Sequence, residues 1–183
     1  MTVLVEDDLQ ITLPATVTGR KFDDKDTHGL SHCMKAVDFI IELPQSLLFV
    51  EFKDPENPKA QAKDRAAFIR KFLSGQLDSD LKTKYRDSWL YEWAQGRVQK
   101  PVTYLILLGA STLSAAELLA RTEALKRQLP MLGPNDQPWQ QAFVAGCAVM
   151  NVATWNQALP QLPVGRVGWL CCTNTPTAGN FAP

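Results

Sequence analysis

Short apolar segments, bounded by proline, glycine and other turn-forming residues, predict five β-strands along the chain. They lie at residues 9–13, 35–43, 47–53, 102–109 and 142–149. The second and third are separated by a three-residue turn that begins with proline, so we expect them to pair as an antiparallel hairpin. The fourth is a continuous apolar run, which is typical of a strand covered on both faces of a sheet.

Apolar residues that recur every three or four positions predict two helices after the hairpin, at residues 59–74 and 78–94. The second helix carries an aromatic stripe, which is more typical of a packed core than of a base-stacking platform. A Ser-x-x-Glu capping box predicts a third helix at 114–129, and Asn151 can cap a short helix that ends near residue 159. A hairpin followed by strands that are linked through helices favours an α/β sandwich, a mixed sheet flanked by helices.

The length and composition of the chain are those of one globular domain that covers residues 1–183. The tail from about residue 171 is rich in threonine, asparagine and proline, and we expect it to be weakly ordered. No apolar run approaches the length of a membrane span, and the first residues lack a basic region and a signal core. We therefore expect a cytoplasmic protein with no membrane partner.

Three charged residues, Asp38, Glu51 and Lys53, interrupt the apolar pattern of the hairpin. If Glu42 faces Leu47, then Asp38 pairs directly with Glu51, and Lys53 lies on the same face of the sheet. This register leaves the other face apolar, whereas a slip of one residue would mix the two faces. The register that gives a clean core is therefore also the one that gathers the three charges.

Two carboxylates and an amine gathered in this way suit a site for Mg²⁺ or Mn²⁺. Asp38 and Glu51 offer hard oxygen ligands, and the backbone carbonyl of Phe52 and water can complete the octahedron. Such an ion polarises a phosphoryl oxygen and lowers the pKa of a bound water, while Lys53 can hold that water and stabilise negative charge on the phosphorus. The alternative is an ion pair between Glu51 and Lys53, with Asp38 solvated at a strand end.

The hairpin resembles the PD-(D/E)XK nuclease superfamily, which has the restriction-endonuclease-like fold. Asp38 and Glu51 match the two motif carboxylates, Lys53 matches the lysine, and Val37 stands where the family has its nominal proline. The resemblance implies a metal-dependent phosphodiesterase on an αβββαβ core, a three-layer sandwich with a mixed central sheet. No amphipathic helix with an acidic residue is evident before the strands, so the pattern supplies no third carboxylate ligand.

The formal net charge is zero, but the charges are unevenly distributed. The first 58 residues have a balance of −6, the next 42 a balance of +5 and the rest a balance of +1. A basic region directly after an acidic metal-site region suits phosphate binding, and Lys82, Lys84 and Arg86 are the candidates for nucleic-acid contacts. The alternative is a pair of solvated helix faces. The resemblance also implies that the helix after the hairpin helps to complete the site, with Lys84 and Tyr85 as candidates.

A charged, loop-like segment at residues 19–31 is expected to cap the site, with Asp23, His28 and His32 in or near it. These histidines have two interpretations: a catalytic or phosphate-contacting residue, or an ordinary surface histidine. A zinc site that combines the two histidines with Cys33 and the adjacent pair Cys171 and Cys172 is conceivable. Buried reduced thiols agree better with the cysteine spacing.

The leading hypothesis is a Mg²⁺- or Mn²⁺-dependent nuclease that hydrolyses phosphodiester bonds, with DNA as the expected substrate rather than RNA. Asp38, Glu51 and Lys53 are its expected catalytic residues. The alternative is a non-catalytic module of the same fold that binds DNA or a protein partner in a larger complex, such as a defence or mobile-element complex. A small-molecule enzyme with a carboxylate–lysine site is a third, weaker hypothesis. A homodimer would suit double-strand cleavage, although no residue demonstrates one.

Overall fold

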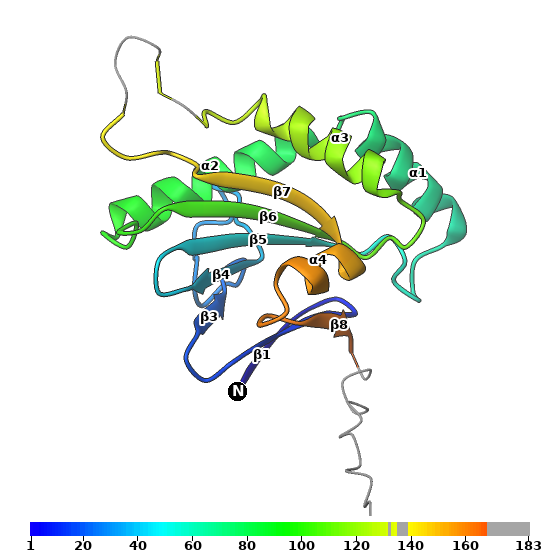
Figure 1. Cartoon of the computed structure of the whole chain (residues 1–183), viewed down its shortest axis with the longest axis horizontal. Helices are drawn as coiled ribbons and strands as arrows, with labels where there is room; N and C mark the ends of the chain where they lie inside the picture. The colour runs from blue at the N-terminus through cyan, green and yellow to red at the C-terminus, as the bar shows by residue number, and fades with distance from the viewer. Residues whose placement is uncertain (132, 135–138, 168–183) are drawn as a thin grey trace, which may run out of the picture.

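A mixed five-stranded sheet lies at the centre of the computed structural model, which describes residues 1–131, 133–134 and 139–167 (Figure 1). Its strands, in their order across the sheet, are β3 (Thr18–Lys21), β4 (Phe39–Glu42), β5 (Leu47–Lys53), β6 (Val102–Leu108) and β7 (Gly146–Asn151). The first three form an antiparallel meander, and β5, β6 and β7 run parallel to one another. The expected α/β class with a mixed sheet is therefore confirmed.

Three helices cover one face of this sheet. Parallel strands cannot be joined by a tight turn, so the chain crosses over the sheet between them. Helices α1 (Ala62–Leu73) and α2 (Asp78–Ala94) link β5 to β6, and α3 (Ala115–Lys126) links β6 to β7. All three lie on the same side in Figure 1, and the short helix α4 (Val152–Ala158) lies on the other side.

A second, antiparallel sheet packs beside α4 on that other face. It contains β1 (Thr2–Glu6), β2 (Leu9–Leu13) and β8 (Val164–Arg166), with β2 in the middle. Arg166 joins this small sheet to the end of β5, because its NH1 lies 2.8 Å from Asp8 Oδ2 and 2.9 Å from Asp54 Oδ2. In the described part of the chain, no helix combines the length and apolar character needed to cross a membrane.

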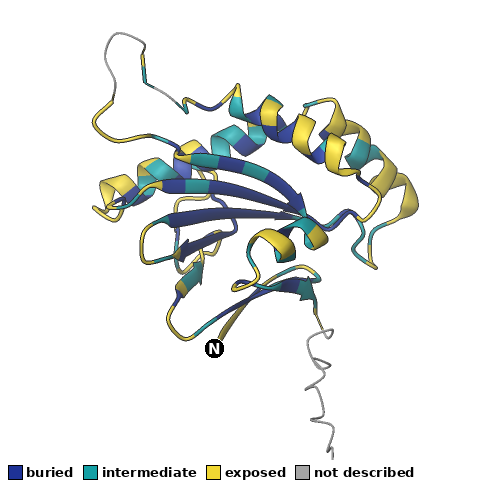
Figure 2. Cartoon of the chain, viewed as in Figure 1, coloured by how far each residue is buried: buried dark blue, intermediate teal, exposed yellow. Residues whose placement is uncertain are grey.

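The central sheet separates two apolar cores, and β5 is buried on both faces (Figure 2). Ile40 and Phe49 point into the core beneath the three helices, together with Tyr85 of α2. Phe39 and Val50 point into the core beneath the small sheet. The face that carries the charged residues is therefore apolar over much of its length, so those charges lie at the border of a core.

Several elements agree closely with the sequence prediction. The bounds of β2, β5 and α2 are those expected, and the capping boxes at Ser114 and Asn151 are both present. The other predicted elements differ at their ends: the first helix begins at Ala62, the third ends at Lys126, and the last predicted strand is shifted to Gly146–Asn151. The tail from residue 171 lies outside the described residues.

The expected strand at 35–43 is shorter than predicted. Before Phe39 the chain leaves the sheet and binds α2, because the N–H of Lys35 donates to Asp87 and the N–H of Val37 donates to the hydroxyl of Ser88. The side chain of Val37 consequently lies in the core beneath the helices. The predicted strand would have placed Val37 with Phe39 on the opposite, apolar face of the hairpin, and this placement is wrong.

Three strands were not predicted, namely β1, β3 and β8. The segment that contains β3 was interpreted as a loop, since Thr-Gly-Arg-Lys has no apolar alternation. It forms an edge strand whose fit depends on Gly19, where a Cβ atom would lie 2.5 Å from a methyl group of Leu13. Pairing with β4, which follows only after a long loop and which the local pattern does not contain, thus determines this strand.

Candidate active site

The register of the β4–β5 hairpin is the one predicted. Glu42 pairs with Leu47 and Phe39 with Val50, where the ladder ends. Asp38, the next residue, lies beside the end of β5, because its carboxylate accepts a hydrogen bond from the Phe52 N–H. Side chains that are two residues apart on a strand share a face, so Lys53 lies on the same side as Glu51. The structure therefore brings together all three residues that were singled out in the sequence.

The carboxylate of Asp38 is held by two donors. Its Oδ2 accepts a hydrogen bond of 2.6 Å from the backbone N–H of Phe52, and its Oδ1 lies 3.3 Å from Nζ of Lys84. The residue is only 3% exposed, and its carbonyl accepts from the N–H of Phe22. Asp38 is therefore a fixed, buried carboxylate, and the alternative of a solvated group at a strand end is wrong.

Glu51 is completely buried, and its two oxygens have different surroundings. Oε1 forms ion pairs with both Lys53 and Lys84, the second at 2.7 Å. Oε2 is buried and has no hydrogen-bond partner among the described residues. Burial, followed by the nearby charge of Asp38, raises the pKa of Glu51 to about 7, against the lowering effect of the two lysines.

Lys84 is the residue of α2 that completes this cluster. Its side chain is 14% exposed and its Nζ approaches both carboxylates, with Asp23 Oδ2 a further 3.9 Å contact on the outer side. Although burial lowers the pKa of Lys84, the charges of Glu51 and Asp38 raise it more, so the net shift is upward. Lys84 is therefore a firmly charged ammonium between two carboxylates.

The donor set fits a hard divalent cation. Asp38 and Glu51 supply carboxylate oxygens, and Glu51 Oε2 is a buried acceptor that has no donor in the described residues. In a strand, the N–H and C=O of one residue point to the same neighbour, so the Phe52 carbonyl points to the side on which its N–H meets Asp38. An ion that keeps several waters, as Mg²⁺ does, needs no more protein ligands than these. No cluster of three or more histidine, cysteine or acidic side chains suited to a metal occurs in the described part of the chain.

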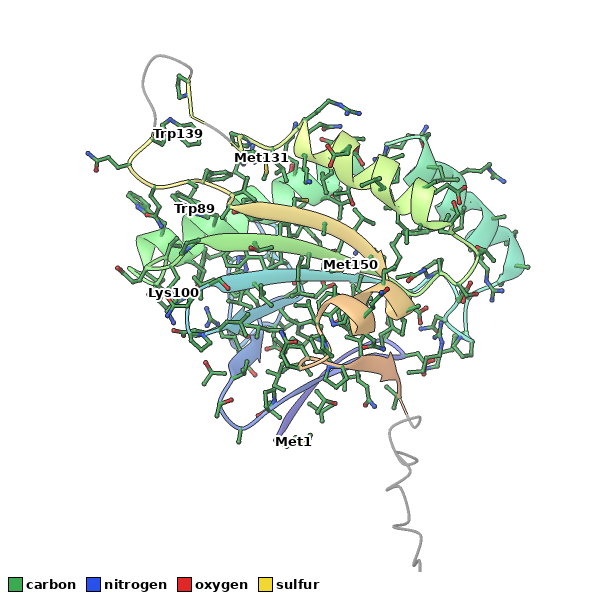
Figure 3. The ribbon with its side chains drawn as sticks, in the orientation of Figure 1. Met1, Trp89, Lys100, Met131, Trp139 and Met150 are labelled. Carbon is green, nitrogen blue, oxygen red and sulfur yellow. The ribbon has the colours of Figure 1, made fainter. Side chains whose placement is uncertain are left out.

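The other predicted nucleic-acid contacts separate from Lys84. Lys82 and Arg86 line a groove of about 280 Å³ with Trp139 and Phe143, on the other side of α2 from the carboxylates. Trp139 is 45% exposed and lies at the same end of the molecule as Trp89 (Figure 3). Phe143 packs against both of these indole rings. This surface combines basic and aromatic groups, but it is distinct from the carboxylate cluster.

Tyr85 does not join the site. Its ring is buried beside Phe49 and Tyr104, and its hydroxyl donates a 2.6 Å hydrogen bond to the carbonyl of Phe143. The expectation that Tyr85 contributes to the site is therefore wrong, and its role is in the core. The helix turns its polar neighbour Lys84 to the site instead.

The histidines of the predicted capping loop lie away from the carboxylates. His28 is buried between Phe22 and Tyr91, where burial lowers its pKa and its Nδ1 accepts from the N–H of Leu30. His32 is exposed. Asp23 is the residue of this loop that reaches the cluster, through Lys84. Apart from the presence of an acidic residue in the loop expected to cap the site, no sequence pattern indicated this contact.

The cysteines show no sign of the conceivable zinc site in the described residues. Cys33 is exposed, Cys147 is buried in the core, and burial raises the pKa of the Cys147 thiol to about 12. Cys171 and Cys172 lie outside the described residues. Cys147 is thus a buried thiol as expected, whereas that expectation is wrong for Cys33.

A separate cavity of the described chain lies elsewhere. It measures about 490 Å³ and lies at the ends of β6 and β7, beside α4 and β8. Its lining is mostly apolar and includes none of Asp38, Glu51, Lys53 and Lys84. The cluster is therefore not enclosed by this cavity, as the site of a small organic substrate would be.

Comparisons of the chain with models of protein families, with curated proteins and with solved structures found no match.

Proposed function

We propose that the chain is a metal-dependent nuclease that hydrolyses phosphodiester bonds in nucleic acid, with DNA as the expected substrate. The observation that carries the proposal is the buried pair of carboxylates, Asp38 and Glu51, which Lys84 contacts together while Lys53 contacts Glu51. Buried carboxylates are costly unless a function or a partner holds them. Binding a cation that in turn coordinates phosphate is a function that would account for this cost.

The arrangement of strands supports the same proposal. An antiparallel three-stranded meander, a helical crossover and a parallel strand correspond to the βββαβ part of the core that the resemblance implies. The helix expected before these strands is replaced, within the described residues, by the β1–β2 hairpin. A third carboxylate from such a helix is therefore not part of the proposed site.

The proposed roles follow from the positions of the side chains. Asp38, Glu51 and the carbonyl of Phe52 would hold a Mg²⁺ or Mn²⁺ ion, which when bound supplies Lewis-acid activation of the phosphoryl group and of water. The Phe52 N–H fixes the rotation of the Asp38 carboxylate. Lys53 is more exposed than either carboxylate, so it lies where it can orient the attacking water and stabilise negative charge on phosphorus.

The groove beside α2 is the proposed contact for the rest of the nucleic acid. Lys82 and Arg86 can approach phosphates, and Trp139 and Phe143 offer aromatic faces next to them. Mixed basic and aromatic surfaces of this kind suit an unpaired strand, because any base can stack on an aromatic ring.

A cleavage assay tests the function. The wild-type protein is incubated with single-stranded DNA, duplex DNA and RNA in Mg²⁺, in Mn²⁺ and in EDTA. We expect cleavage in both metals and none in EDTA, and we expect Asp38→Asn and Lys53→Met to reduce the rate by at least about 100-fold. Asp26→Asn removes an exposed acid of the nearby loop and is the matched control. Undiminished cleavage in both site variants would refute the assignment.

A second function, a non-catalytic module that binds DNA or a protein, is favoured by one observation. Lys53 and Lys84 together already balance the charges of the two carboxylates, so the described site is electrostatically complete without an added ion. Such a module would bind an oligonucleotide equally well in EDTA and in Mn²⁺, and would give no heat of Mn²⁺ binding. Calorimetry with Mn²⁺ therefore discriminates between the two functions.

A further inference from the structure

The ammonium group of Lys84 contacts both of the carboxylates that would hold a metal ion. Nζ is 2.7 Å from Glu51 Oε1 and 3.3 Å from Asp38 Oδ1. Mg²⁺ requires its oxygen ligands at about 2.0–2.1 Å and in near-octahedral geometry. A Mg²⁺ ion held by these two carboxylates would therefore compete directly with the Lys84 ammonium for Asp38 Oδ1, because the other oxygen of Asp38 accepts the Phe52 N–H.

The charges of the cluster lead to the same conclusion. Asp38 and Glu51 can carry two negative charges, and Lys53 and Lys84 carry two positive ones. A divalent ion added to this balanced group would leave a buried excess of positive charge, which is unfavourable unless a lysine moves out. Lys84 is the lysine that contacts both carboxylates, whereas Lys53 contacts Glu51 alone.

The structure provides a place to which Lys84 can move. Asp23 Oδ2 lies 3.9 Å from its Nζ, and the Asp23 side chain is half exposed. The four-carbon stem of lysine is flexible, so the ammonium can change partners while α2 stays in place. Asp23 is thus a third carboxylate on the solvent side of the cluster, positioned to receive the displaced group.

We propose that Lys84 is the resident cation of the metal-free site and that a divalent ion binds Asp38 and Glu51 only when Lys84 withdraws towards Asp23. Lys84 is then a built-in competitor that sets the metal concentration at which the site becomes occupied. This inference rests on the proposed function, because it describes how the same metal site is regulated.

The test is calorimetric titration with Mn²⁺ of the whole chain after removal of metal by a chelator. The variants are Lys84→Gln, which keeps a hydrogen-bond donor for the carboxylates, and Lys84→Met, which keeps only the apolar stem. We expect both to bind Mn²⁺ at least about tenfold more tightly than wild type, because no buried ion pair has to be broken first. Lys53→Met removes an equal charge from a position that does not bridge the carboxylates, and we expect a smaller gain.

Thermal unfolding gives a readout that is independent of catalysis. In EDTA, Lys84→Gln should unfold at a lower temperature than wild type, since the two carboxylates lose their shared counter-charge. Saturating Mn²⁺ should raise the unfolding temperature of Lys84→Gln by more than that of wild type. If Lys84→Met fails to fold, Lys84→Gln alone decides the result.

The outcomes separate this inference from the proposed function. Tighter Mn²⁺ binding by the Lys84 variants supports the competition, and binding by these variants but not by wild type supports it most strongly. Binding by wild type that the Lys84 variants leave equal or weaken overturns the competition while the metal site stands. No Mn²⁺ binding by any of the proteins overturns the metal site and the competition together.

Discussion

Replacing the buried carboxylate of Glu51 with the neutral amide of glutamine should change how the stability of the protein depends on pH. In the folded chain burial raises the pKa of Glu51 to about 7, from 4.5 in the unfolded chain. Between these two values the folded protein holds a proton that the unfolded chain has released. The contribution of Glu51 to the unfolding free energy is therefore fully present below pH 4.5 and is lost as the pH rises through 7.

The size of the effect follows from the two pKa values. Each unit of difference corresponds to about 1.4 kcal/mol, so the pKa values of about 7 and 4.5 amount to about 3 kcal/mol. Glutamine has no charge to bury, so Glu51→Gln should lack this loss. We therefore expect the wild type to lose about 3 kcal/mol of unfolding free energy relative to Glu51→Gln between pH 4 and pH 8.

The assay is urea denaturation of both proteins in a chelating buffer at intervals from pH 4 to pH 8.5. Glu117→Gln is the matched control, because hydrogen bonds from the backbone and side chain of Ser114 lower the pKa of Glu117. Its contribution has the opposite sign, since it is present above the unfolded pKa and is lost as the pH falls. If the profiles of wild type and Glu51→Gln run parallel over the whole range, burial does not control the ionisation of Glu51, and the reasoning is refuted.

Three further predictions concern other parts of the fold. Lys82→Ala should weaken oligonucleotide binding in a filter or anisotropy assay and reduce the salt dependence of binding by about one phosphate contact, whereas Lys71→Ala on α1 should do neither. If the plots of log affinity against log salt concentration have equal slopes for Lys82→Ala and wild type, Lys82 is not part of the interface. Tyr85→Phe should lower the unfolding free energy by about 1–2 kcal/mol, because the Phe143 carbonyl loses its donor, and should leave cleavage intact; lost cleavage at unchanged stability would return Tyr85 to the site. Ser114→Ala should cost about 1 kcal/mol in urea denaturation through the capping box of α3, without altering Mn²⁺ binding; an unchanged midpoint would show that the cap is dispensable.

The hairpin could be predicted in detail because its register has a single good solution. The side-chain period of a strand is two, so one slip would move Glu42 and Leu47 out of alignment and transfer core side chains to the other face. The same pattern located α2 and β5 to the residue. Local periodicity was sufficient wherever an element buries a continuous face.

The position of Lys84 was expected from the family resemblance, which made it a candidate to complete the site, and not from the pattern of the residues. The sequence grouped it with Lys82 and Arg86, although residues two apart on a helix point in very different directions. Which of these directions meets the carboxylates depends on how α2 packs on the sheet, and that is set by contacts between distant residues such as Tyr85 and Tyr104. The edge strand β3 escaped prediction for a related reason, since its pairing with β4 is also long-range.

The hydrogen bond from the Phe52 amide to Asp38 makes one backbone proton a direct reporter of the carboxylate pair. Any ligand, proton or cation that redistributes charge on Asp38 should shift the amide resonance of Phe52 in a nitrogen–proton correlation spectrum. The amide of Val50, in the paired part of the same strand, provides an internal reference. Occupancy of the site can therefore be followed by spectroscopy in the intact protein, before any substrate is known.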